Sequence, residues 1–407
     1  MTPDWYRFYI ALDGNGVDGF EGMAGVCQFR YDPVGGGYAY KVRYFNGASA
    51  GHATSVSPDG TVGFLGNAGQ HLVFFDAHTL EEIDRISTLR YEPTDTTMQG
   101  STHIIWLDGG EFIICIGEYL YRFELGKLNR GERIAPHKVK LPHGMKRTPS
   151  GRYICYGSMD HPQLGEAKEI GIFDLQTGEA QRVGLPTTCW HLVCHPENDH
   201  VYPVSFRVLP QAGDDYHQWA IGFFKEYLFE IDATCGQVLR HWSSSRETPA
   251  HINSDVTISD SEVIFCNGAS QSIVFIDLES LAEARMIDER PALPARLRAS
   301  RQIGTQMYDA FARGSIFTNN NHFLAAMRVS RFTMLDSVYA TQLSADGSLL
   351  FTANRGLNHI TVYDYPSNEL RLRVQMPPLQ DYVPSLPVLA DPRLGFHHGH
   401  LVSPART

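Results

Sequence analysis

The sequence is short of basic residues. Lys and Arg number 34 against 45 Asp and Glu, which gives a formal net charge of -11. Nucleic acids and anionic membrane surfaces attract clustered Lys and Arg, so neither is expected as a partner. The chain also lacks an uninterrupted apolar run of about 18 residues and a signal-like first segment. We therefore expect a cytoplasmic protein without a membrane or nucleic-acid partner.

Cysteine is sparse and shows no pairing pattern. The seven cysteines include no Cys-x-x-Cys motif. Cys115, Cys155 and Cys266 lie in the apolar runs "FIICIG", "RYICYG" and "VIFCNG", where a free thiol behaves as a small hydrophobe. This pattern argues against a disulfide framework or a cysteine-based zinc site. It favours a reducing compartment.

The sequence contains a motif that is repeated along most of its length. An apolar pair, an acidic residue and a turn recur seven times, as in "VFFDAHTLE" and "GIFDLQTGE". Short polar turns such as "SPDGT" and "SADGS" precede most copies, which is typical of hairpins. Each unit therefore predicts four antiparallel strands. The acidic positions are Asp32, Asp76, Glu124, Asp174, Asp232, Asp277 and Asp364.

The spacing of these copies predicts the fold class. Neighbouring acidic positions are 44 to 58 residues apart, near the period of a propeller blade, except for a last interval of 87. Seven such units predict an all-β, seven-bladed β-propeller that spans 1–407 as a single domain. The long interval predicts a partly helical insertion at 288–337. We expect it on the face of the propeller where the innermost strands begin, which we call the top face. Two roles stay open for it, a cap over a pocket or a homodimer contact.

The two ends of the chain are expected to share one blade. "HHGHLVSP" near the C-terminus matches "GHATSVSP" of 51–58, which predicts an innermost strand. The N-terminal runs "WYRFYIAL", "AGVCQFRY" and "YAYKVRYF" would supply the other three strands. Joining the ends in one sheet removes the open edges of a propeller.

Histidines recur where the inner strands are predicted to start. His52, His143 and His398 each lie six residues before the proline of the next turn, and His400 follows on the same side of its strand as His398. Inner strands line the channel of a propeller, so these side chains would converge near its top mouth. Imidazole is a common ligand of transition metals. We predict a metal site, with Fe or Cu favoured and Mn or Zn as alternatives, built from His52, His103, His143, His191, His251, His398 and His400. The alternative for any one of them is a hydrogen bond between blades.

The long connections are predicted on the same face as these histidines. Long ordered loops are commonly binding loops or lids that exclude water. Arg207 lies in one of them, and Arg355 lies in a short loop, "ANRGLNH", on the same face. Both are candidates for holding an anionic substrate group, because a guanidinium can donate two hydrogen bonds to one carboxylate. Tyr339 stands in the one blade without a histidine and is a candidate for proton transfer.

The repeats carry a resemblance to a known group of folds. "VSPDG", an apolar strand and then "FD...TGE" resemble the YVTN-type seven-bladed propellers, which include the amine dehydrogenase heavy-chain-like superfamily and the sugar lactonases. This resemblance covers nearly the whole chain and implies a fold, not an activity. The C-terminal "GFHHGHLVSP" alone is similar to histidine segments of carotenoid cleavage oxygenases, oligogalacturonate lyases and nitrous oxide reductases, which bind iron, manganese and copper.

Four functions can be weighed against these features. A histidine-rich site favours a metal-dependent oxidoreductase that acts on a small organic molecule at the top mouth of the channel. A Mn- or Zn-dependent lyase or hydrolase is the first alternative. A non-catalytic propeller that serves as a binding subunit or scaffold is the second alternative, and it needs no metal. A metal-free lactonase would place acidic and arginine groups on the axis instead of imidazoles.

Overall fold

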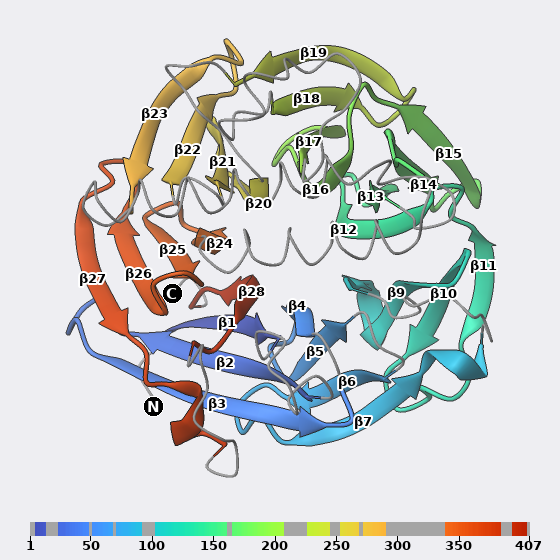
Figure 1. Cartoon of the computed structure of the whole chain (residues 1–407). Coiled ribbons are helices and arrows are strands. Elements are labelled where there is room, and N and C mark those ends of the chain that lie inside the picture. The colour runs from blue at the N-terminus through green and yellow to red at the C-terminus, as the bar shows by residue number, and fades with distance from the viewer. Residues whose placement is uncertain are drawn as a thin grey trace, which may run out of the picture. The chain divides into compact units, whose positions relative to one another are not determined.

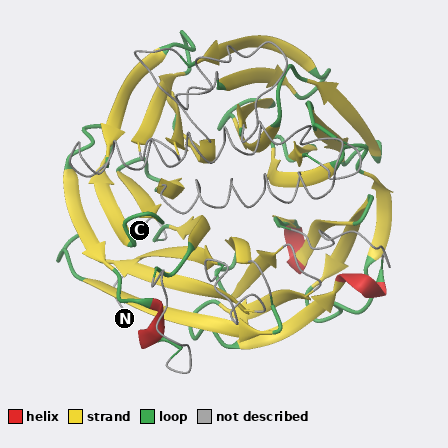
Figure 2. Ribbon diagram, in the orientation of Figure 1, coloured by secondary structure: helices red, strands yellow, loops and turns green. Residues whose placement is uncertain are grey.

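β-Strands make up nearly all of the regular structure in a computed structural model of the chain. It describes residues 5–13, 23–48, 51–67, 71–91, 102–160, 165–206, 226–244, 253–267, 272–289, 338–383 and 393–404. The strands form seven four-stranded antiparallel sheets, the blades of a seven-bladed β-propeller, as predicted (Figure 1). Helical structure in these ranges consists of three 3-10 turns, Thr88–Arg90, Asp108–Gly110 and Leu379–Asp381 (Figure 2). None of the described helices could cross a membrane.

The chain divides into two compact units, which are described separately. Unit 1 comprises Met1–His137 and Ala340–Thr407, and unit 2 comprises Lys138–Tyr339. Unit 2 is therefore inserted, in sequence, between the two parts of unit 1.

Unit 1 contains the blade that both ends of the chain share. Its strand order is β28 (Phe396–Val402), β1 (Tyr6–Leu12), β2 (Met23–Tyr31) and β3 (Tyr38–Asn46). The innermost strand therefore comes from the C-terminal part and the other three from the N-terminal part, as predicted. In the register of β1 and β28, Tyr9 lies opposite His400 and Ile10 opposite Gly399.

Three further blades are made wholly or mainly by unit 1. The first is β4 (Gly51–Val56), β5 (Val62–Asn67), β6 (His71–Asp76) and β7 (Glu82–Ser87); the second is β8 (Ile105–Trp106), β9 (Glu111–Ile116), β10 (Tyr119–Glu124) and β11 (Glu132–Pro136). The third is β24 (Val338–Leu343), β25 (Leu349–Asn354), β26 (His359–Asp364) and β27 (Leu370–Gln375), where the first two residues of β24 belong to unit 2.

Unit 2 contains three blades. They are β12 (Leu141–Arg147) with β13 (Tyr153–Met159), β14 (Glu169–Asp174) and β15 (Glu179–Gly184); β16 (Cys189–Cys194) with β17 (His200–Ser205), β18 (Tyr227–Asp232) and β19 (Gln237–Ser243); and β20 (Asn253–Ile258) with β21 (Glu262–Asn267), β22 (Ser272–Asp277) and β23 (Glu283–Asp288). Beyond β23, residues 290–337 lie outside the described residues. The predicted helical insertion is thus not tested.

The repeated acidic residue has a local structural role. It lies at or just after the end of the third strand of a blade. At Asp32, Asp76, Asp174, Asp232 and Asp277 its side chain accepts hydrogen bonds from backbone N–H groups of the following turn. Asp76 accepts from Thr79 at 2.7 Å and from His78 at 2.8 Å. These bonds, led by that from Thr79, lower the pKa of Asp76. Asp232 accepts the N–H of Thr234 in the same way at 2.8 Å. The repeat therefore marks the turn between strands three and four.

Apolar clusters lie between consecutive blades within each unit. Side chains alternate along a strand, so β1 sends Phe8 and Ile10 toward β25 and β26, while Tyr9 and Ala11 pack toward the blade of β4. In unit 2, equivalent clusters join the blades of β12 and β16 and those of β16 and β20. Burial of both faces of each blade accounts for the near-continuous apolar runs in the sequence.

Candidate metal centre

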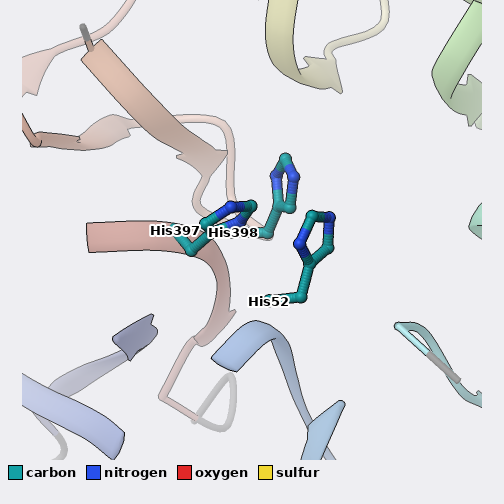
Figure 3. A group of neighbouring side chains, drawn as sticks. All are labelled: His52, His397 and His398. Carbon is teal, nitrogen blue, oxygen red and sulfur yellow. The ribbon is translucent and has the colours of Figure 1, made fainter. Parts of the chain in front are cut away.

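Three imidazoles gather in unit 1, and we call them the three-histidine group. His52 comes from β4, and His397 and His398 come from β28; one ring nitrogen of each lies within 4.8 Å of the others (Figure 3). The ring centroids are 3.9 Å apart for His52 and His397, 5.1 Å for His52 and His398, and 4.9 Å for His397 and His398. His397 and His398 are each 3% exposed, and His52 is half-buried.

A β-bulge explains how two consecutive residues of β28 reach the same group. Leu12 pairs with Phe396 and Ile10 with Gly399, so Ala11 lies opposite both His397 and His398. An extra residue on one strand lets both side chains point to the same face of the sheet. That is the face of Ala11, which packs toward the blade of His52.

The same irregularity recurs at the starts of inner strands in both units. One strand of each pair has an additional residue in β4, β12, β16, β20 and β28. In β4 the additional residue is His52 itself, and in β12 and β16 it is Gly144 and Trp190, next to His143 and His191. Bulges re-aim side chains near functional sites. Here they set the direction of several histidines.

The ring separations can be compared with those around a bound ion. A metal–nitrogen bond of about 2.1 Å places a ring centroid about 3.2 Å from the ion, so two ligands at 90 to 110° have centroids about 4.5 to 5.2 Å apart. The separations of 5.1 and 4.9 Å agree with this range. The separation of 3.9 Å is shorter, so one ring would have to move outward. We expect His52 to make that adjustment because it is the most exposed of the three. The three-histidine group can therefore hold a metal ion.

His103 lies beside the group. Its ring centroid is 6.1 Å from that of His52 and 5.7 Å from that of His398. Both separations are within the maximum of about 6.4 Å that two ligands of one ion can have. Its Nδ1 is 3.0 Å from the hydroxyl of Thr102. A partner on Nδ1 orients the ring and directs Nε2 as the ligating atom.

Two hydrogen bonds between blades position the strands that carry these residues. The buried Thr54 of β4 donates to the carbonyl of Tyr9 at 3.1 Å, which joins β4 to the sheet of β28. Trp106 of β8 donates its indole N–H to Ser55 at 3.0 Å. Gly51 permits the close approach, since a Cβ there would clash with the carbonyl of Leu12.

Unit 2 brings two of the predicted ligands together. The rings of His143 and His191 have centroids 4.6 Å apart and are both buried. Nδ1 of His143 is 3.2 Å from the carbonyl of Trp190. That carbonyl lies against Gly144 and Gly157, where a Cβ would clash with it.

Asp160 follows β13 in unit 2 and is hydrogen-bonded to two neighbouring segments of the chain. It accepts hydrogen bonds from the backbone N–H of Ala167 at 2.7 Å and from the hydroxyl of Thr188 at 3.0 Å. Burial raises the pKa of the Asp160 carboxyl, and these two bonds offset the rise only in part. A carboxyl of this kind holds a proton at a higher pH than an exposed one.

Arg355 already has a carboxylate partner within the protein. Its side chain is fully buried, and Nη2 donates to both oxygens of Asp13 at 3.0 and 2.8 Å. Nη1 donates to the carbonyl of Phe396 at 3.2 Å. The residue thus ties the loop after β25 to the ends of β1 and β28. Its guanidinium binds the carboxylate of Asp13 in this structure, and its role in holding a substrate group stays a prediction.

Four further predicted site residues do not belong to the three-histidine group or are not described by the structure. His400 lies on the same face of β28 as His398, opposite Tyr9, but is outside the three-histidine group. Tyr339 is fully buried in β24, and its role in proton transfer stays a prediction. Arg207 and His251 lie outside the described residues.

His397 is the member of the group that the sequence argument missed. The two-residue period of a regular strand pairs His398 with His400 and assigns His397 to the opposite face. The bulge overrides that period. The doublet "HH" is the sequence feature that could have identified His397. It indicates two ligands on one face only if a bulge is assumed at that point of the strand.

The chain matches no family model and no curated protein sequence. Among solved structures it is similar to a chain titled Kuenenia stuttgartiensis Hydrazine Synthase. The TM-score is 0.55 and the identity 12%, over 80% of this chain and 87% of that one. At this identity the likeness shows the propeller fold alone. Since 1432 chains of solved structures match, the fold does not identify a reaction. The finer resemblance to YVTN-type propellers stays a prediction.

Proposed function

We propose that the protein is a metal-dependent enzyme that acts on a small organic molecule, with an ion held by His52, His397 and His398. The observation that carries this proposal is the convergence of three imidazoles, from two strands far apart in the sequence, with one nitrogen of each within 4.8 Å of the others. His103 is the candidate for a fourth ligand because its ring lies 5.7 Å from that of His398.

The chemistry of the donors favours iron or copper. Imidazole nitrogens suit Fe, Cu, Zn and Ni better than Mg or Ca, which prefer oxygen ligands. A redox-active ion would supply oxidative chemistry, and the three histidines would hold it in place. Burial of His397 and His398 would limit access of water to that side of the centre.

A metal-dependent lyase or hydrolase is the second candidate. It is favoured by the same set of three neutral imidazoles, which is also a ligand set of catalytic zinc. Such an ion would act as a Lewis acid toward the substrate. The identity of the ion therefore separates the two candidates.

Metal analysis of purified protein tests the proposal. After expression with supplemented Fe, Cu, Mn and Zn, we expect about one ion per chain in the wild type. His397→Ala should lower the content at least tenfold. His400→Ala is the matched control on the same strand and should retain the ion. A wild type that stays metal-free after reconstitution would leave a non-catalytic binding or scaffold protein as the better explanation.

A further inference from the structure

Two cysteines of unit 2 lie side by side between neighbouring blades. Cys155 belongs to β13 and Cys194 ends β16, and both pack in the apolar cluster that joins these two blades (Figure 1). The two thiols are hydrogen-bonded to each other. Both cysteines are free in this structure. The two sulfurs are therefore neighbours that no covalent bond yet joins.

Packed strands hold this pair of thiols in place. Leu192 of β16 and Val201 of β17 lie in the same cluster as Cys155. The turns next to the two cysteines also meet, because the backbone N–H of Ser150 donates to the carboxylate of Asp199 at 3.4 Å. The contact between the sulfurs is thus a part of the interface between the two blades.

The two thiols differ in their access to solvent. Cys155 is fully buried, whereas Cys194 is half-buried. The hydrogen bond with Cys194 and, after it, burial raise the pKa of the Cys155 thiol well above its usual value. Cys155 therefore keeps its proton at neutral pH. An oxidant from solution meets Cys194 first and finds a second thiol directly behind it.

This arrangement is the one that reversible cysteine oxidation requires. Cysteines that sense oxidants are accessible and lie next to a second cysteine that can attack the oxidised sulfur. A disulfide in a reducing compartment, which the sequence favours, is usually transient and serves redox sensing or catalysis. The pair of Cys155 and Cys194 meets the geometric condition, since one sulfur is accessible and the other is its buried neighbour.

We propose that Cys155 and Cys194 form a reversible disulfide when the protein meets a peroxide. The sulfur of Cys194 attacks one oxygen of hydrogen peroxide, the O–O bond breaks, and a sulfenic acid and water are formed. The sulfur of Cys155 then attacks the sulfur of Cys194, the S–O bond breaks, and the leaving hydroxide takes the proton of Cys155 to form a second water. Two electrons pass from the two sulfurs to the peroxide. Exchange with a small thiol reverses the bond. The site is independent of the three-histidine group.

Peptide mapping of peroxide-treated protein tests this proposal. The folded protein is treated with hydrogen peroxide, quenched with catalase, denatured, alkylated and digested with chymotrypsin, which cleaves after Trp190 and so separates Cys194 from Cys189. We expect a linked pair of peptides that contains Cys155 and Cys194, lighter by two hydrogens than the separate peptides and absent after treatment with dithiothreitol. Cys235→Ser is the matched control because Cys235 is the exposed cysteine of the same unit, and this variant should form the link as the wild type does.

The variant Cys155→Ala should form the link at least about tenfold less than the wild type. Dimedone, which traps sulfenic acids, should then label Cys194. Because Cys155 is buried, circular dichroism first establishes that this variant folds, and the map of the wild type decides the question if it does not. Oxidation of Cys194 to a sulfinic acid without a link overturns the proposal. A link from Cys194 to another cysteine, or no reaction of Cys194 in excess peroxide, also overturns it.

Discussion

Arg355 is predicted to be one of the most important residues for stability in unit 1. Replacing it with Met keeps an unbranched side chain of similar length but removes all donors to Asp13 and to the carbonyl of Phe396. Asp13 is left with a carboxylate whose side chain is only 12% exposed. The blade that both ends of the chain share, which we call the closing blade, should therefore lose one of the buried polar contacts that tie β1 and β28 to the blade of β25.

The structure sets the size of this effect. Breaking a buried ion pair by removing one partner costs about 3 to 5 kcal/mol. The partial exposure of Asp13 favours the lower end, about 3 kcal/mol. For a denaturant dependence of about 3 kcal/mol per molar, the urea midpoint would fall by about 1 M. Replacing both residues, as Arg355→Met with Asp13→Leu, should recover more than half of the loss, because no unpaired charge is then buried.

Urea unfolding followed by tryptophan fluorescence measures the change. Arg371→Met is the matched control, since Arg371 pairs with Asp364 at 3.0 Å while both side chains are more than one third exposed. An exposed pair of this kind contributes less than about 1 kcal/mol. If Arg355→Met shifts the midpoint no more than the control does, the argument that this buried pair secures the closing blade is wrong.

Two further predictions concern other contacts of the fold. Thr54→Val keeps the shape of a buried side chain but removes its hydrogen bond to the carbonyl of Tyr9. We expect the free energy of unfolding, measured with urea, to fall by about 1 kcal/mol. An unchanged free energy of unfolding would mean that this bond does not stabilise the fold. Burial tends to raise the pKa of Glu230, but hydrogen bonds led by that from Arg240 outweigh it and lower the pKa below the ordinary 4.5. The stability that Glu230 provides is thus present above about pH 4.5 and is lost as the pH falls through the lowered value, so Glu230→Gln should show a smaller drop in urea midpoint on acidification than the wild type.

The fold could be predicted from the sequence because its signals are local. Asp76 marks a turn by accepting hydrogen bonds from the next few N–H groups, and Asp32, Asp174, Asp232 and Asp277 do the same in their copies. The match between "HHGHLVSP" and "GHATSVSP" was enough to place β28 innermost, because equivalent strands share the same pattern.

The candidate centre could be predicted only in part, because its geometry depends on tertiary contacts. His52, His103 and His398 were identified from their positions relative to the turns, and they do lie near one another in unit 1. His397 was missed because the bulge in β28 becomes evident only from its register with β1. The ion pair of Arg355 with Asp13 could not be predicted, because nothing in the sequence links two residues more than three hundred positions apart.

The order in which the chain is made gives the three-histidine group a particular timing. His52 leaves the ribosome early, and every strand from β5 to β27, including all of unit 2, is synthesised before His397 and His398 emerge. Domains generally fold as units during synthesis, yet unit 1 must wait for its second part. A nascent chain would therefore hold an incomplete ligand set until β28 is added. Under the proposed function, metal binding by this group would follow completion of the closing blade.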